Sequence, residues 1–178
     1  MNADGNFPLE NNSVDAIVSG DVLGHVPDIP TTLKEWARVL KKGAGVSLFT
    51  EASYSEKDRS LMARLAKKGI DMCEAVPEHI SLFPKEVLEK MFADAGFEVV
   101  ERKSANVLHW FFFPKDYLLL FKRFKKKPFL YYLSVVWNAI LKVSPFYPVP
   151  ADFMRLTLTR LFGDSAYGTS YFYLLRKK

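Results

Sequence analysis

The feature that most constrains this chain is a strand, helix, strand pattern over residues 14–51. A first apolar run at residues 16–18 and a second around Leu48 flank residues 33–40, where apolar side chains recur at helical spacing. Short apolar runs joined through a helix are typical of parallel strands that are covered on both faces. Such a unit needs a right-handed crossover that packs the helix on the sheet. The sequence therefore predicts a doubly wound α/β fold.

Proline and glycine mark the ends of the predicted helix. Pro30 suits a first helical turn, where its missing amide costs no hydrogen bond. Gly43 follows the last residue of the helical pattern, where a left-handed residue often ends a helix. We therefore expect the helix to continue up to Gly43.

A second helix and strand follow at residues 84–101. Pro84 is expected as the first residue of the helix, Gly96 as its end, and residues 97–101 as the strand. One face of this helix is apolar, with Val87, Leu88, Met91, Phe92 and Ala95. This face is expected to pack on the sheet.

Two segments in this order resemble a known family. The sequence SVDAIVSGDVLGHVPD begins at Ser13, and HISLFP at His79 precedes AGFEVV at Ala95. Both are similar to class I S-adenosylmethionine-dependent methyltransferases of the kind related to ubiquinone and menaquinone methyltransferases. The resemblance covers only the C-terminal part of a family member, because the family's glycine-rich turn after its first strand has no counterpart here. It implies a partial Rossmann-like sheet and S-adenosylmethionine as the cofactor.

The same resemblance assigns cofactor contacts to two loops. Asp4 and Gly5 match the turn after the family's third strand, whose aspartate meets the adenine amino group. A carboxylate suits that role because it accepts hydrogen bonds. Ser19, Gly20 and Asp21 match the end of the fourth strand, whose backbone lies against the methionine part of the cofactor.

His25 and His79 are the candidate catalytic bases, because histidine titrates near neutral pH. The alternative for each is a structural histidine that holds a loop by hydrogen bonds, and His109 is a weaker candidate. Gly24 stands where the family usually has a glutamate. Three histidines and one cysteine without ligand spacing predict no zinc site.

Residues 115–163 are expected to form two or three helices, separated by Pro128, Pro145 and Pro148. In the resembled family, variable helices at this point cover the acceptor substrate. Residues 169–175 are rich in strand formers and match the family's last strand, which runs antiparallel beside the fifth. We therefore expect a single truncated domain over residues 1–178, with a helical insertion before an antiparallel last strand.

A basic block at residues 122–127 carries five positive charges in six residues, and aromatic segments lie on both sides of it. Aromatic rings interleaved with lysines suit an anionic membrane surface. A solvated helix end, the lining of an apolar pocket and helices that cap the sheet remain alternative interpretations. The apolar run at 129–141 is shorter than the ~20 residues of a membrane span. Nucleic-acid binding is not expected, because the basic block lies between apolar helices.

Two function hypotheses follow. The first is methyl transfer to a small or lipid-like acceptor. The second is a non-catalytic methyltransferase-fold remnant that acts as a membrane-surface or protein-interaction module.

The apolar run at 16–18 would be an exposed edge without a first strand, which predicts a homodimer or association with a missing N-terminal half. The single cysteine, Cys73, and the absence of a signal peptide predict a cytoplasmic protein, peripheral at the membrane if that surface binds lipid.

Overall fold

The structure is a computed structural model. It describes residues 6–55, 57–58, 60–71, 78–105, 108–144, 149–163 and 169–178. The strands are β1 (Val14–Gly20), β2 (Leu40–Glu51), β3 (Phe97–Ser104) and β4 (Ser170–Lys177). They form one sheet in the order β1-β2-β4-β3, in which β1 and β2 are parallel and β4 is antiparallel to both of its neighbours. This confirms the α/β fold and the antiparallel last strand beside β2.

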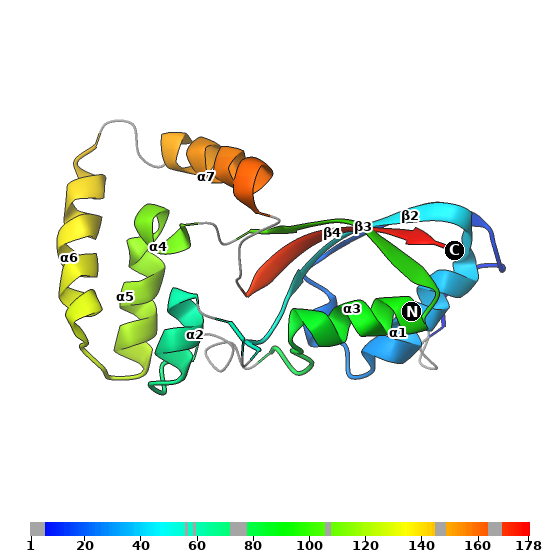
Figure 1. Cartoon of the computed structure of the whole chain (residues 1–178), viewed down its shortest axis with the longest axis horizontal. Coiled ribbons are helices and arrows are strands. Elements are labelled where there is room, and N and C mark those ends of the chain that lie inside the picture. The colour runs from blue at the N-terminus through cyan, green and yellow to red at the C-terminus, as the bar shows by residue number, and fades with distance from the viewer. Residues whose placement is uncertain are drawn as a thin grey trace.

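Helices α1 (Ile29–Val39) and α3 (Lys85–Asp94) both cover the same face of the sheet (Figure 1). Their apolar sides meet side chains of the strands in one core, which includes Trp36, Leu48, Phe92 and Tyr173. Each large apolar side chain buried in this way contributes about 1.5–3 kcal/mol to folding. The covered face is therefore the main source of stability of the sheet.

The opposite face of the sheet is largely open. The side chain of Val18 in β1 is 85% exposed, and Phe172 and Leu174 in β4 are each 42% exposed. Phe49 lies beside Phe172, with 5.0 Å between ring centroids. The prediction of strands covered on both faces is thus wrong for this chain. Within the described residues, only helix α7 (Val149–Phe162) reaches this face, through Leu156 and Thr159 at its end near β3.

Helix α1 starts as predicted but ends earlier. Asp28 caps it by accepting a hydrogen bond from the Thr31 amide at 3.1 Å, and Pro30 lies in the first turn. The helix stops at Val39 because Leu40 is extended (φ −69°, ψ 142°) and pairs with Val14 of β1. Gly43, with φ 78°, therefore lies within the first residues of β2 instead of ending the helix.

Helix α3 agrees more closely with the sequence. Pro84 is its N-terminal cap, one residue before the helix, and Gly96 follows its end with φ 90°. Only glycine adopts such a φ at little cost, which explains the stop at that position. The strand that follows extends to Ser104, three residues beyond the predicted end.

The remaining helices form a separate region beside the end of the sheet (Figure 1). They are α2 (Leu61–Ala66), α4 (His109–Phe112), α5 (Pro114–Arg123), α6 (Phe129–Lys142) and α7. Helices α2 and α5 and the turn after α2 share a second apolar core, which consists of Met62, Leu65, Ile70, Tyr117, Leu120 and Phe121. Helices α5, α6 and α7 lie in the segment where two or three helices were predicted. Among the described residues, no helix combines the length and hydropathy needed to cross a bilayer.

Candidate functional site

The candidate site lies where the parallel strands β1 and β2 end side by side. Ligands of open α/β sheets bind outside the carboxyl ends of parallel strands, so this edge is where a site is expected. Asp21 follows β1 directly, and its amide donates to the Phe49 carbonyl at 3.0 Å, which continues the pairing with β2. Glu51 is the last residue of β2. The strand ends therefore place two carboxylates together.

The residues predicted to lie against the cofactor occupy the end of β1. Ser19 is buried, and its Oγ is buried with no hydrogen-bond partner. Asp21 has a left-handed backbone with φ 57°, a conformation that aspartate adopts more readily than most residues. Asp4 and Gly5, the other predicted cofactor contacts, lie outside the described residues.

Both candidate histidines lie at this edge, because the backbone carbonyl of Gly24 holds their two segments together. The Gly24 carbonyl accepts hydrogen bonds from the amides of Ile80 and Ser81, at 2.9 and 3.1 Å. This anchors the loop that contains His79 next to the short 3-10 helix Leu23–His25. The ring centroids of His25 and His79 consequently lie 4.8 Å apart.

A hydrogen bond fixes the proton on His25. Its Nδ1 lies 2.8 Å from the Glu78 carbonyl oxygen. Because a carbonyl only accepts, Nδ1 carries the hydrogen in the neutral ring, and Nε2 keeps a lone pair. Nε2 lies 3.8 Å from Asp21 Oδ1. In the neutral ring, Nε2 is therefore the nitrogen that can accept a proton from a substrate.

Gly24 leaves room for a carboxylate from the neighbouring strand. A Cβ atom at position 24 would lie 3.7 Å from Glu51 Oε2 and 3.6 Å from Cδ2 of His79. The carboxylate of Glu51 thus lies next to the position where the resembled family usually has a glutamate side chain. Glu51 was missed by the sequence reasoning. The signal that could have found it is its position at the end of a strand parallel to the one before Asp21.

Glu51 is the residue of the site whose pKa is shifted far from its usual value. Burial, followed by the nearby Asp21 carboxylate, raises the pKa of Glu51 to about 7. Its Oε2 is buried and has no hydrogen-bond partner. A carboxyl group in this state can hold or release a proton near neutral pH.

Three of these side chains are close enough to hold a metal ion. One ligand atom from each of Asp21, His25 and His79 lies within 4.8 Å of the others. Spacing along the chain gave no sign of this cluster, because His79 joins it from a distant loop. The absence of a metal site stays a prediction. His109 lies elsewhere, with Nε2 3.1 Å from Asp116 Oδ2 at the start of α5.

Residues 3–102 match the model of the methyltransferase domain family. The match takes in β1, α1, β2, α3 and most of β3, and with them every residue of the site described above. The chain belongs to the methyltransferase domain family. This confirms the resemblance read from the sequence and supports S-adenosylmethionine as the cofactor.

Curated relatives each match somewhat more than half of the chain. The demethylmenaquinone methyltransferase of Oceanobacillus iheyensis is 32% identical over 111 residues, which cover 55% of this chain and 47% of that protein. The demethylmenaquinone methyltransferase of Staphylococcus saprophyticus is 33% identical over 113 residues, covering 56% and 48%. The chain thus spans about half the length of the curated relatives it matches.

A solved structure extends the likeness to the helices. The [4+2]-cyclase SpnF superposes with a TM-score of 0.50 at 14% identity, over 97% of this chain and 53% of that one. At this identity the likeness shows the fold alone. Since that protein is described as a cyclase, the fold by itself does not identify the reaction.

Proposed function

We propose that this chain provides the acceptor side and part of the cofactor site of an S-adenosylmethionine-dependent methyltransferase. The observation that carries the proposal is the coincidence of the family match with the cluster at the strand ends. Asp21, His25, Glu51 and His79 meet where ligands of such sheets bind. They come from segments distant in the sequence, which is typical of a built site.

The chain's own groups fit the methionine end of the cofactor. The unpartnered Oγ of Ser19 and the carboxylate of Asp21 can receive the polar and positively charged atoms of that end. When bound, the cofactor would supply an electrophilic methyl group on a positively charged sulfur. The chain would contribute mainly position, because aligned reactants account for much of the rate of a displacement.

A proton acceptor is needed when the acceptor atom is an oxygen or carbon. His25 is held in one orientation by the Glu78 carbonyl and directs Nε2 toward Asp21. His79 lies against it, and both are within the same cluster. We assign the role of base to this pair, with Asp21 stabilising the protonated ring of His25.

The acceptor is proposed to be small or lipid-like. The named activity of the relatives, demethylmenaquinone methylation, and the apolar helices α4–α7 support an apolar acceptor. The open sheet face and the edge strand β1, where Val18 is 85% exposed, support a second contributor to the site. We propose a second copy or an N-terminal half that pairs with β1 as that contributor.

Calorimetry with S-adenosylhomocysteine tests the proposal on the full chain. We expect binding in the micromolar range and at least about tenfold weaker binding by Asp21→Ala. Asp15→Ala is the matched control, because Asp15 is an exposed aspartate on the same strand, paired with Lys41 at 2.6 Å. A folded chain that binds no cofactor at millimolar concentration would overturn cofactor binding by this chain alone, and would leave the missing N-terminal half or the non-catalytic remnant as the explanation.

A further inference from the structure

Helix α6 carries apolar side chains on the side that faces away from the protein. The exposed positions recur at helical spacing and form one stripe, here called the α6 stripe: Phe129, Tyr132, Leu133, Val136, Ile140 and Val143. Phe129, Val136 and Val143 are 78%, 60% and 83% exposed. A helix on the surface of a soluble domain usually presents polar residues there. The stripe therefore needs an explanation outside the core of this chain.

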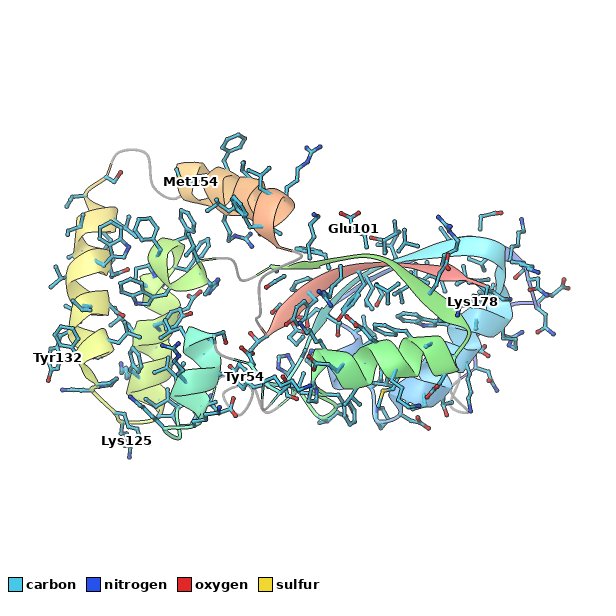
Figure 2. All side chains as sticks on the ribbon, in the orientation of Figure 1. Tyr54, Glu101, Lys125, Tyr132, Met154 and Lys178 are labelled. Carbon is cyan, nitrogen blue, oxygen red and sulfur yellow. The ribbon has the colours of Figure 1, made fainter. Side chains whose placement is uncertain are left out.

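The orientation of α6 is fixed by contacts on its other side. Trp110 in α4 donates from Nε1 to Ser134 Oγ at 2.9 Å. Trp137 donates from Nε1 to the Phe111 carbonyl at 2.6 Å. Rotating the helix to bury the stripe would break both bonds. Figure 2 accordingly shows Tyr132 on the outer side of the helical region.

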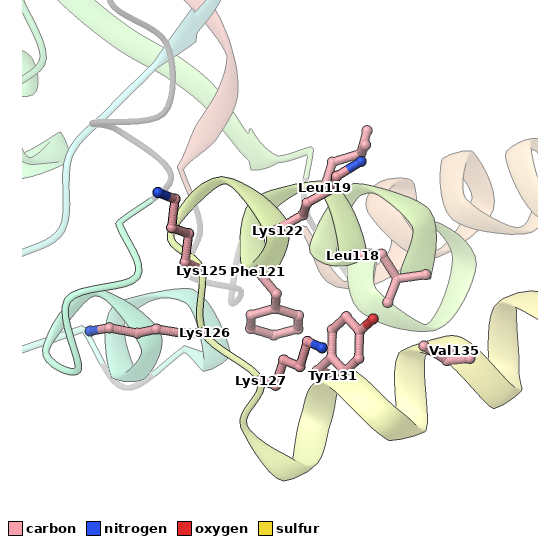
Figure 3. A pocket seen from close by; sticks show the side chains of 9 residues that line it. All are labelled: Leu118, Leu119, Phe121, Lys122, Lys125, Lys126, Lys127, Tyr131 and Val135. Carbon is pink, nitrogen blue, oxygen red and sulfur yellow. The ribbon is translucent and has the colours of Figure 1, made fainter.

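Positive charges lie next to the N-terminal end of α6. A groove of about 410 Å³ lies between α5 and α6, with Leu118, Leu119 and Val135 on its apolar walls (Figure 3). Lysines 122, 125, 126 and 127 also line it. Lys127 Nζ lies 5.7 Å from the centre of the Tyr131 ring. An apolar groove and a cationic rim therefore occur together.

Charge selects among the possible occupants of this surface. The sequence from Tyr117 to Pro150 contains six lysines and arginines and no aspartate or glutamate. Two copies packed through this surface with parallel α6 helices would bring their basic blocks together, and like charges repel. Antiparallel α6 helices would instead place each basic block against a segment of the other copy that has no carboxylate to pair with it. An anionic lipid bilayer instead presents negative headgroups above an apolar layer, and matches both parts of the surface.

We propose that the α6 stripe and the lysines of residues 122–127 form a docking surface for an anionic membrane. Helix α6 lies in the plane of the interface, with the stripe at the boundary between headgroups and acyl chains. Lys122, Lys125 and Lys127 contact the headgroup phosphates. Lys126 instead holds the surface to the end of α2, because its Nζ donates to the Lys68 and Gly69 carbonyls at 2.6 and 3.2 Å. This proposal goes beyond methyl transfer and does not depend on it, although it would place the chain beside lipid-like acceptors.

Co-sedimentation of the full chain with vesicles tests the docking surface. We expect binding to phosphatidylcholine vesicles that contain roughly one-third phosphatidylserine, weak binding to pure phosphatidylcholine, and loss of binding as salt rises. The double variant Phe129→Ser/Val136→Ser should bind at least about tenfold more weakly, because both side chains leave the acyl boundary. The variant Lys125→Gln/Lys127→Gln should bind more weakly and with a smaller dependence on salt.

Matched controls separate docking from general surface effects. Val100→Ser removes an exposed apolar side chain of β3, and Lys90→Gln removes an exposed lysine on α3. Both should bind vesicles like the parent chain, and circular dichroism should show all variants folded. Equal binding by every variant, or no binding to anionic vesicles at low salt, would overturn the proposal. So would light scattering that shows a dimer converted to a monomer by Phe129→Ser/Val136→Ser.

Discussion

The sheet region and the helical region differ in how much of their apolar side-chain surface is buried. Where α1 and α3 cover the sheet, large side chains such as Phe92 and Leu48 are almost completely buried. In α6, by contrast, Ser134 is the one buried residue, although the helix is mostly apolar. The covered side of the sheet is thus explained by the chain's own core. The sequence of α6 is explained only when something outside the described chain is considered.

The largest expected contrast is between Phe92 and Phe129. Phe92 is fully buried, and its ring meets Tyr173 edge-on at 5.2 Å between centroids. Phe92→Ala should lower the free energy of unfolding by about 3–5 kcal/mol, because it leaves a cavity in the core. Phe129→Ala should change it by less than about 0.5 kcal/mol. Urea denaturation measures the free energy of unfolding of each variant. Similar decreases for the two variants would contradict the difference between the two regions.

The next contrast concerns ion pairs of the sheet region. Glu35 in α1 is buried and accepts hydrogen bonds from Arg38 and from the Phe7 amide, each at 2.7 Å. Glu35→Ala should lower the free energy of unfolding by roughly 2–4 kcal/mol, because the partners lose their acceptor in a site shielded from water. Glu98→Ala, which removes an exposed contact to Arg176, should cost less than about 1 kcal/mol. Thermal unfolding of both variants measures the two losses of stability. A loss for Glu35→Ala as small as that for Glu98→Ala would contradict the prediction.

A buried hydroxyl tests whether the helical region is held together by its own contacts. Ser134 accepts from Trp110 and donates to the Leu130 carbonyl at 2.7 Å. Ser134→Ala leaves the indole N–H without its acceptor and should lower stability by about 1–2 kcal/mol. Ser47→Ala, at an exposed position of β2, is the control. Hydrogen exchange should locate the effect in α4–α6, and an effect spread over the sheet would show that the two regions unfold together.

The smallest expected effect depends on pH. The folded-state pKa of Glu51 is about 7, above the value of about 4.5 for a free glutamate, so folding favours its protonated form. Wild-type stability should therefore fall as pH rises from about 4.5 to 7. Glu51→Gln should be more stable than wild type at pH 8 by on the order of 1 kcal/mol, after allowance for solvent screening, and equal to it near pH 4. Unfolding at both pH values is the measurement, with Asp15→Asn as an exposed control. A constant difference would mean that Glu51 is not the titrating group.

Local patterns predicted much of the architecture. The strand pattern at 14–51, the stop at Gly96 and the helices between the prolines were found because each depends on neighbouring residues. The end of α1 was missed for the opposite reason. Its helical pattern continues through Leu40, but pairing with Val14, distant in sequence, takes that residue into β2.

The site was only partly predictable for the same physical reason. Asp21 and His25 belong to one local motif, and the resemblance identified them. The approach of His79 depends on the Gly24 carbonyl, and the role of Glu51 depends on the alignment of two strand ends. Tertiary contacts of this kind leave no period in a sequence. The catalytic roles of the histidines, the absence of a metal and the association through β1 stay predictions.

The position of β4 also has a consequence for how the protein is made. This strand is the last of the four along the chain, yet it lies between β2 and β3 and hydrogen-bonds to both. A ribosome therefore releases β1, β2 and β3 before the strand that joins β2 to β3 exists. Until then β2 and β3 each present a free edge to which another chain can pair.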